Sequence, residues 1–86
     1  MTKVQTILIE RIVQLCREKG YSYYSLAYRV AIPVTTLMNI INGQSKNPGI
    51  VTIMKICNAF EVTLKDFFDT EEFELVLKEV DEEKSC

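Results

Sequence analysis

Residues 22–43 of the 86-residue chain read SYYSLAYRVAIPVTTLMNIING, and this stretch decides the fold. In its first part, three apolar side chains recur at helical spacing, namely Leu26, Ala27 and Val30. The pattern then breaks, and Pro33 opens a second helical segment, because proline is tolerated in the first turn of a helix. Gly43 suits the left-handed conformation with which many helices end. The stretch therefore predicts two short helices joined by a tight connection.

The second helical segment has two different faces. Leu37, Ile40 and Ile41 recur at i, i+3 and i+4, which predicts one buried face. The opposite face is uncharged but supplied with hydrogen-bonding groups, and it comprises Thr35, Met38, Asn39 and Asn42. Two helices with a short turn, the second presenting small polar side chains outward, form the helix-turn-helix pattern of DNA-binding proteins.

Length and composition bound the fold class. Eighty-six residues make one domain, and an apolar fraction of 48% is adequate for a single core. No run of eighteen apolar residues occurs in the sequence, so no membrane span is expected. No stretch alternates with a period of two residues, so the chain is expected to be all-α.

The three cysteines, Cys16, Cys57 and Cys86, are an odd and widely spaced set. Because the sequence has no histidine and no C-x-x-C pair, we expect no metal site and no cofactor. Such cysteine usage indicates a reducing cytosol, so a cytoplasmic protein is expected. Cys16 and Cys57 lie in apolar periodic segments and are expected in the core, whereas Cys86 is expected to be a free thiol at a frayed end.

The charge is distributed unevenly, although the net charge is only −2. Residues 1–68 carry eight basic and four acidic side chains, a balance of +4. Residues 69–86 carry two basic and eight acidic side chains, a balance of −6. This asymmetry is compatible with a body that binds nucleic acid and carries an acidic appendage.

Apolar periodicity predicts six helices in all. They span residues 4–19, 23–30, 33–42, 50–60, 64–68 and 71 to about 84. Gly20 is predicted to end the first helix, and Ser22 and Thr63 are predicted N-caps of the second and fifth. We divide the chain into a helix-turn-helix domain at 1–69, with the motif at about 22–43, and an acidic C-terminal helix or tail at 70–86.

The last predicted helix has an apolar stripe on an otherwise acidic rod. The stripe consists of Phe73, Val76, Leu77 and Val80. An isolated helix of this length is marginal in water, so the stripe needs a surface to pack on. Three alternatives remain open at this point: the helix packs back onto the body against the first helix, it forms a dimer contact, or it is disordered.

Several short motifs between Ile12 and Phe68 follow a known order and spacing. They are Leu26-Ala27, the Ile40-x-x-Gly43 ending, Pro48 followed by Thr52-Ile53, and the closure Ala59-Phe60-x-Val62-x-Leu64-x-x-Phe67-Phe68. In these features the chain resembles the XRE family, the lambda-repressor/Cro-type helix-turn-helix regulators, over about two thirds of its length. The resemblance implies an all-α, five-helix lambda-repressor-like DNA-binding domain, to which the C-terminal amphipathic helix is an addition.

The resemblance also implies which residues contact double-stranded DNA. The family's base-contacting positions correspond to Val34, Thr35, Met38 and Asn39. Its phosphate-contacting positions correspond to Tyr23, Asn42, Gln44, Ser45 and Lys46. The chain departs from the family at four places: Tyr23, where glutamine is common, Ala31, where glycine is frequent, Pro33, where serine or threonine is frequent, and Ile41, where glutamate is usual.

Helix 33–42 is expected in the major groove, where Asn39 is the one base-contacting residue able to form a bidentate contact. Specificity per half-site is then low, which favours a homodimer, with Phe73, Val76, Leu77 and Val80 as candidate contacts. We therefore expect a sequence-specific transcriptional regulator that acts as a repressor.

An enzyme is not expected, because the sequence offers no histidine and no motif for nucleophilic or phosphate chemistry. The rival hypothesis is a non-catalytic protein-interaction module on a helix-turn-helix scaffold, with weak or no DNA binding. On that hypothesis Tyr23, Tyr24 and Tyr28 form a packing or interface patch, Asn42 caps its helix, and Lys46 is a solvated loop charge.

Overall fold

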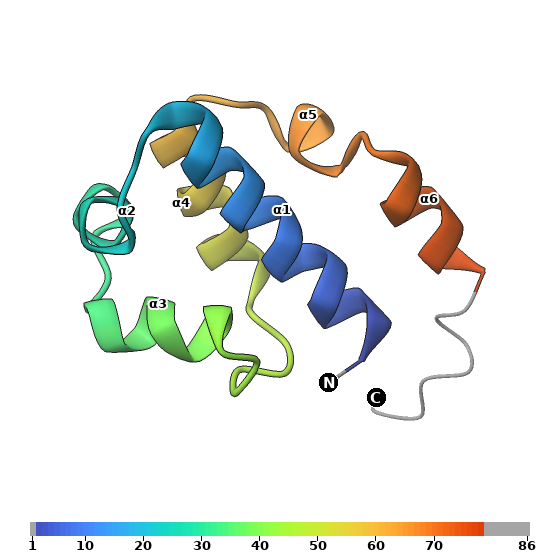
Figure 1. Cartoon of the computed structure of the whole chain (residues 1–86), viewed down its shortest axis with the longest axis horizontal. Coiled ribbons are helices and arrows are strands. Elements are labelled where there is room, and N and C mark those ends of the chain that lie inside the picture. Colours follow the sequence, from blue (N-terminus) through green and yellow to red (C-terminus); the bar gives the residue numbers. More distant parts are fainter. Residues whose placement is uncertain (1, 79–86) are drawn as a thin grey trace.

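The computed structural model describes residues 2–78, and within that range the chain is helical with no strand (Figure 1). The helices are α1 (Lys3–Lys19), α2 (Tyr23–Val30), α3 (Val34–Ile41), α4 (Ile50–Phe60), α5 (Leu64–Phe68) and α6 (Glu71–Leu77). The predicted all-α fold, with five helices followed by an additional one, is confirmed. None of the helices in residues 2–78 has the length and apolarity needed to cross a bilayer.

The helix ends show why the elements begin and stop where they do. Gly20 ends α1 in the left-handed conformation at φ 72°, where a side chain would be strained. The hydroxyls of Ser22 and Thr63 accept the backbone N–H groups of Ser25 and Asp66. These three predicted caps are confirmed, so local sequence sets the ends of α1, α2 and α5.

The third helix is one residue shorter at each end than the predicted 33–42. Pro33 precedes the helix as its N-cap, with ψ 145°, which is not a helical value. Asn42 follows as the C-cap, and Gly43 takes the left-handed conformation at φ 79°. The turn between α2 and α3 is made by Ala31, which adopts a left-handed φ of 63° without being glycine.

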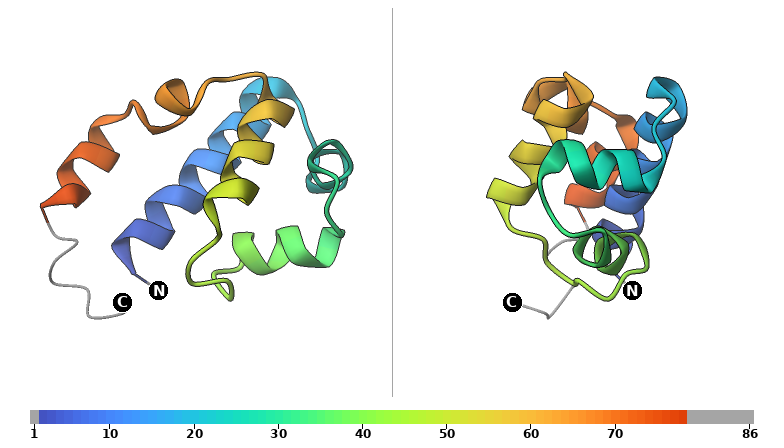
Figure 2. Two further views of the ribbon diagram at one scale, coloured as in Figure 1. Left: turned by 180° about the vertical axis from the view of Figure 1, so that it is seen from behind. Right: turned by 90° about the vertical axis from the view of Figure 1, so that its left-hand side faces the viewer.

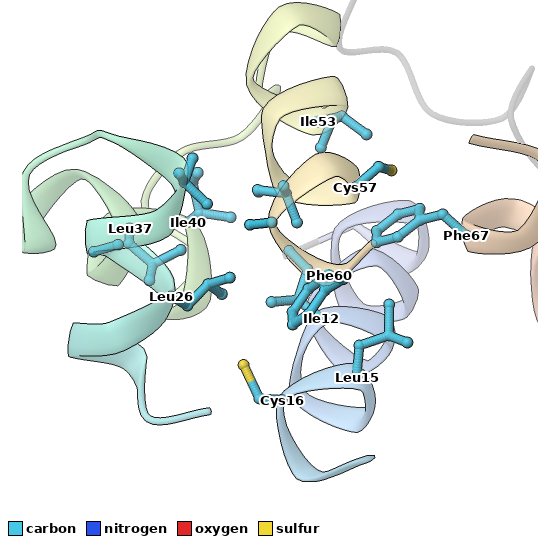
Figure 3. Packing of buried hydrophobic residues seen from close by; sticks show 14 of the residues in the cluster. Ile12, Leu15, Cys16, Leu26, Leu37, Ile40, Ile53, Cys57, Phe60 and Phe67 are labelled. Atoms are coloured by element: carbon cyan, nitrogen blue, oxygen red, sulfur yellow. The ribbon is translucent and has the colours of Figure 1, made fainter. Parts of the chain in front are cut away.

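The core lies where α1, α2, α3 and α4 converge. Ile12, Leu26, Leu37, Ile40 and Phe60 point toward one another in Figure 3 and are all buried. Figure 2 (right) shows how the helices are arranged around them: α2 crosses above α3, with α1 on one side and α4 on the other. Cys16 and Cys57 are buried in this core as predicted. The helix-turn-helix pair is therefore held by a scaffold of flanking helices.

An arginine of α1 fixes the position of α5. The Arg11 side chain donates from Nε to the carbonyl oxygen of Phe67 and from Nη2 to that of Asp66, each at 2.7 Å. Its guanidinium also lies 5.9 Å from the centroid of the Phe67 ring. The carbonyl groups at the end of α5, which have no partner within the helix, are satisfied in this way. The chain consequently enters α6 beside α1.

α6 packs against α1, which is the first of the three alternatives for the tail. Val76 is buried, and the half-buried Phe73 ring meets Phe68 edge-on at 4.9 Å. The interpretation of a single stripe is wrong for Leu77, which is 65% exposed. Successive helical residues are about 100° apart, so α1 covers the side of Val76 and leaves its neighbour outside. Val80, Cys86 and the continuation of the helix to residue 84 lie outside the described residues.

Candidate nucleic-acid interface

The outward face of α3 carries the polar side chains that the sequence placed there. Thr35, Asn39 and Asn42 are exposed, and Met38 is half-buried. Leu37, at 0% exposure, and Ile40 point to the opposite side and anchor the helix in the core. The predicted separation of the two faces is confirmed for Leu37 and Ile40, and Ile41, the third residue of the predicted buried face, is half-buried against the core. This arrangement presents hydrogen-bonding groups on a helix whose inner face is fixed.

A groove of about 830 Å³ runs along α3 from Val34 to Asn39. Its walls come from the second half of α1, the start of α2 and the outward face of α3. Five predicted DNA contacts line it, namely Tyr23, Val34, Thr35, Met38 and Asn39. The structure therefore brings the predicted base-contacting residues together with one predicted phosphate contact, although Val34 comes 11 positions after Tyr23 and the other α3 residues come later still.

The floor of the groove is apolar and uncharged. Val34 is only half-buried and packs against the core, so part of its side chain is withdrawn from the surface. Cys16 also lines the groove, and burial raises the pKa of its thiol above the ordinary value. The thiol consequently stays protonated and neutral at physiological pH. Among the polar side chains that line the groove, those of Thr35 and Asn39 are exposed and therefore accessible to a ligand.

The loop after α3 carries the remaining predicted phosphate contacts and is tied to the C-terminus of α3. The backbone N–H groups of Gln44 and Ser45 both donate to the carbonyl oxygen of Asn39, at 2.9 and 3.0 Å. The backbone N–H of Asn42 donates to the carbonyl oxygen of Met38 at 2.8 Å. Lys46 follows on the same loop with an exposed side chain. These hydrogen bonds fix the loop relative to the outward face of α3.

A buried glutamine of α1 holds the same loop from behind. The Gln5 side chain, 5% exposed, donates from Nε2 to the carbonyl oxygens of Gly43 and Ser45, both at 3.3 Å. Its Oε1 accepts the backbone N–H of Thr2 at 3.0 Å, which completes a capping box at the start of α1. The T-x-x-Q spacing signals the capping box in the sequence, but nothing local signals the contact with the loop.

The three tyrosines of α2 differ in exposure. Tyr23 is half-buried and packs against the core, whereas Tyr24 and Tyr28 are exposed. Tyr24 lines the groove beside α3, and Tyr28 does not. Tyr21, which the sequence did not single out, stacks on Phe60 with ring centroids 5.9 Å apart. The guanidinium of Arg29 lies 4.6 Å from the Tyr21 ring centroid, so this arginine is engaged in packing.

Comparisons with known proteins agree with this geometry. Residues 11–72 match the family model of the Cro/C1-type helix-turn-helix DNA-binding domain, a range that includes every residue proposed above to contact DNA. The chain is also 35% identical over 65 residues to the HTH-type transcriptional regulator SlrR of Bacillus subtilis (strain 168). That match covers 74% of this chain and 43% of the relative, so the chain spans less than half the length of this curated relative. No solved structure matches the chain.

Proposed function

The chain belongs to the Cro/C1-type (XRE) helix-turn-helix family of DNA-binding regulators, and on that premise we propose that it binds double-stranded DNA sequence-specifically by inserting α3 into the major groove. One observation carries the proposal. The outward face of α3 is polar and accessible, while Leu37 and Ile40 fix its inner face in the core. A helix held in this way can be inserted without rearrangement of the domain.

Base recognition in this proposal rests on the groove-lining side chains of α3. The amide of Asn39 can accept from and donate to the major-groove edge of adenine, and Thr35 can donate or accept. Val34 and Met38 supply apolar contact, for which a thymine methyl group is the matching partner. A good bidentate contact discriminates by about 1–3 kcal/mol, and Asn39 alone among these four residues can form one.

Backbone contacts position α3 in the groove. The candidates are Tyr23, Asn42, Gln44, Ser45 and Lys46, and Lys46 is the cation among them. Because Gln5 and the carbonyl oxygen of Asn39 fix the loop, Lys46 is carried at a defined place beside α3. Such contacts carry no sequence information, but they set the register of the recognition helix.

We propose that the chain acts as a homodimer and as a repressor. Two copies would read half-sites about 34 Å apart, which compensates for the single bidentate contact per copy. Of the candidate dimer residues, Phe73 and Val76 already pack against the body, so Leu77 is the part of this stripe left exposed within residues 2–78. Occupancy of a promoter by such a dimer would repress transcription.

The direct test is selection from random duplex DNA, followed by affinity measurements with the full chain. We expect an enriched motif with two related half-sites, and Asn39→Ala should relax the preference at one base pair per half-site. Thr36, exposed on the same helix but outside the groove, provides the matched control Thr36→Ala. Absence of any enriched motif would overturn the proposal, and a single half-site with a monomeric sedimentation mass would overturn the dimer.

A second candidate function is a non-catalytic protein-interaction module. The specific observation in its favour is the exposure of large apolar or aromatic side chains on α2 and α4. They are Tyr24, Tyr28, Ile50, Val51 and Met54. Exposed side chains of this size are enriched at protein interfaces. If the selection yields no motif while Tyr28→Ala weakens a protein complex, this candidate replaces DNA binding.

A further inference from the structure

The groove beside α3 contains a cation that no family position accounts for. Arg17, in the last turn of α1, lines the same groove as Tyr23, Thr35 and Asn39. A cation at this position is favourable for the C-terminal end of α1, because the helix dipole is negative there. The structure also places its exposed side chain on the groove that the proposed base-contacting residues line.

Arg17 differs from the other arginines in what its side chain does. Arg11 donates to the backbone of α5, and Arg29 lies over the ring of Tyr21. Arg17 is exposed and has no hydrogen bond or ion pair among the residues that the structure describes. Its acidic neighbour Glu18 accepts a hydrogen bond from Gln14 at 3.2 Å. The Arg17 guanidinium therefore has all its N–H donors and both faces free of contacts with the described residues, and its side chain lines the groove.

We propose that Arg17 binds a backbone phosphate of the DNA that α3 reads, on the side of that helix that faces the last turn of α1. The inference deepens the proposed function and rests on it. A helix inserted in the major groove has a sugar-phosphate backbone along each side, and a guanidinium matches the geometry of a phosphate. The apolar floor formed by Val13 and Cys16 suits the less polar sugar moiety.

Two cations then anchor α3 at different places. Lys46 contacts the backbone from the loop after the C-terminus of α3, and Arg17 contacts it from the last turn of α1. Each phosphate neutralised contributes about −0.9 to the slope of log affinity against log salt concentration. Lys46 is the one cation among the phosphate-contacting positions of the family, so it alone would contribute one such increment to the slope. Arg17 contributes a second.

The test measures the affinity of the full chain for a selected duplex at about 50 and about 200 mM salt. For Arg17→Ala we expect an affinity loss of about tenfold at the lower concentration. The salt slope should fall by about 0.9, so that the difference from the wild type shrinks about 3.5-fold at the higher concentration. Arg17→Lys should keep the wild-type slope, because it keeps the charge.

The matched control is Lys19→Ala. Lys19 is an exposed cation two residues further along, and it does not line the groove. Its removal should leave the slope within about 0.3 of the wild-type value, because an exposed charge outside the contact is screened. A second measurement replaces single phosphates of the duplex by neutral methylphosphonates. One such position should weaken wild-type and Lys19→Ala binding but not the binding of Arg17→Ala.

The outcomes separate the two proposals. If Arg17→Ala and Lys19→Ala change the slope equally, or if no methylphosphonate position depends on Arg17, the inference about Arg17 is wrong and DNA binding stands. If the wild-type chain selects no duplex at all, the proposed function fails and this inference fails with it.

Discussion

α3 and α6 are both short helices with apolar side chains at helical spacing, yet the fold treats them differently. α3 buries Leu37 and Ile40 almost completely. α6 buries Val76, half-buries Phe73, and leaves Leu75 and Leu77 mostly exposed. The difference follows from the number of surrounding elements: α3 meets α2 and lies on the common core, whereas α6 packs mainly on α1. Periodicity predicts that a helix has a buried face, and the surrounding elements decide how much of that face is covered.

The largest effect is expected when the Leu37 side chain, which holds α3 in the core, is truncated. Leu37→Ala deletes a side chain with no exposure and leaves a cavity between α3 and α2, so we expect the free energy of unfolding to fall by about 3 kcal/mol. Urea denaturation followed by circular dichroism measures the loss. Thr36→Ala, at the adjacent exposed position, should change stability by less than about 0.5 kcal/mol. A loss for Leu37→Ala below that for Val76→Ala would contradict the comparison.

The next effect concerns the loop that ends the recognition unit. Gln5→Leu leaves the carbonyl oxygens of Gly43 and Ser45 without their donor, so we expect a loss of about 2 kcal/mol. DNA affinity should fall as well, because Lys46 is no longer held in place. Gln5→Glu is the matched variant, since it keeps the acceptor for Thr2 and loses both donors. Wild-type affinity in both variants would show that the loop needs no support from α1.

A smaller effect is expected on α6, where Val76 is buried and its neighbour Leu77 is exposed. Val76→Ala removes buried methyl groups from the contact with α1, and we expect a loss of about 1.5 kcal/mol by thermal or urea denaturation. Leu77→Ala should change monomer stability by less than about 0.5 kcal/mol, because the side chain is exposed. Sedimentation of Leu77→Ala then reports on the proposed dimer contact separately from folding. Equal losses of stability in Val76→Ala and Leu77→Ala would show that both side chains pack against the body, as the sequence predicted.

The smallest expected effect is a gain in stability from a substitution in the turn before α3. Ala31 holds a left-handed φ of 63°, a conformation that costs an alanine about 1–2 kcal/mol. Ala31→Gly removes this strain. It also lowers the free energy of unfolding by about 0.5–1 kcal/mol, because glycine has more conformational freedom in the unfolded chain. We expect a net gain of about 0.5–1 kcal/mol, visible as a higher Tm. Ala27→Gly, in the right-handed α2, should instead lower Tm.

Much of the fold and part of the candidate site could be predicted from the sequence. The bounds of α2, α4 and α5 agree with the prediction, α1 begins one residue earlier, and α3 is one residue shorter at each end. The caps at Gly20, Ser22 and Thr63 and the two faces of α3 were also predicted. All of these features depend on residues within about one helical turn of each other, so spacing along the chain encodes them.

Only the tertiary structure decided the contacts that join distant segments. Gln5 reaches carbonyl groups 38 and 40 residues away, and Arg11 reaches groups 55 and 56 residues away. In the sequence, Arg11 and Arg17 are equivalent polar residues of one amphipathic helix. The directions that the helices take across the core separate them: one arginine meets the end of α5 and the other meets the groove beside α3. The crossing of helices depends on how their buried side chains pack together, which no local pattern specifies.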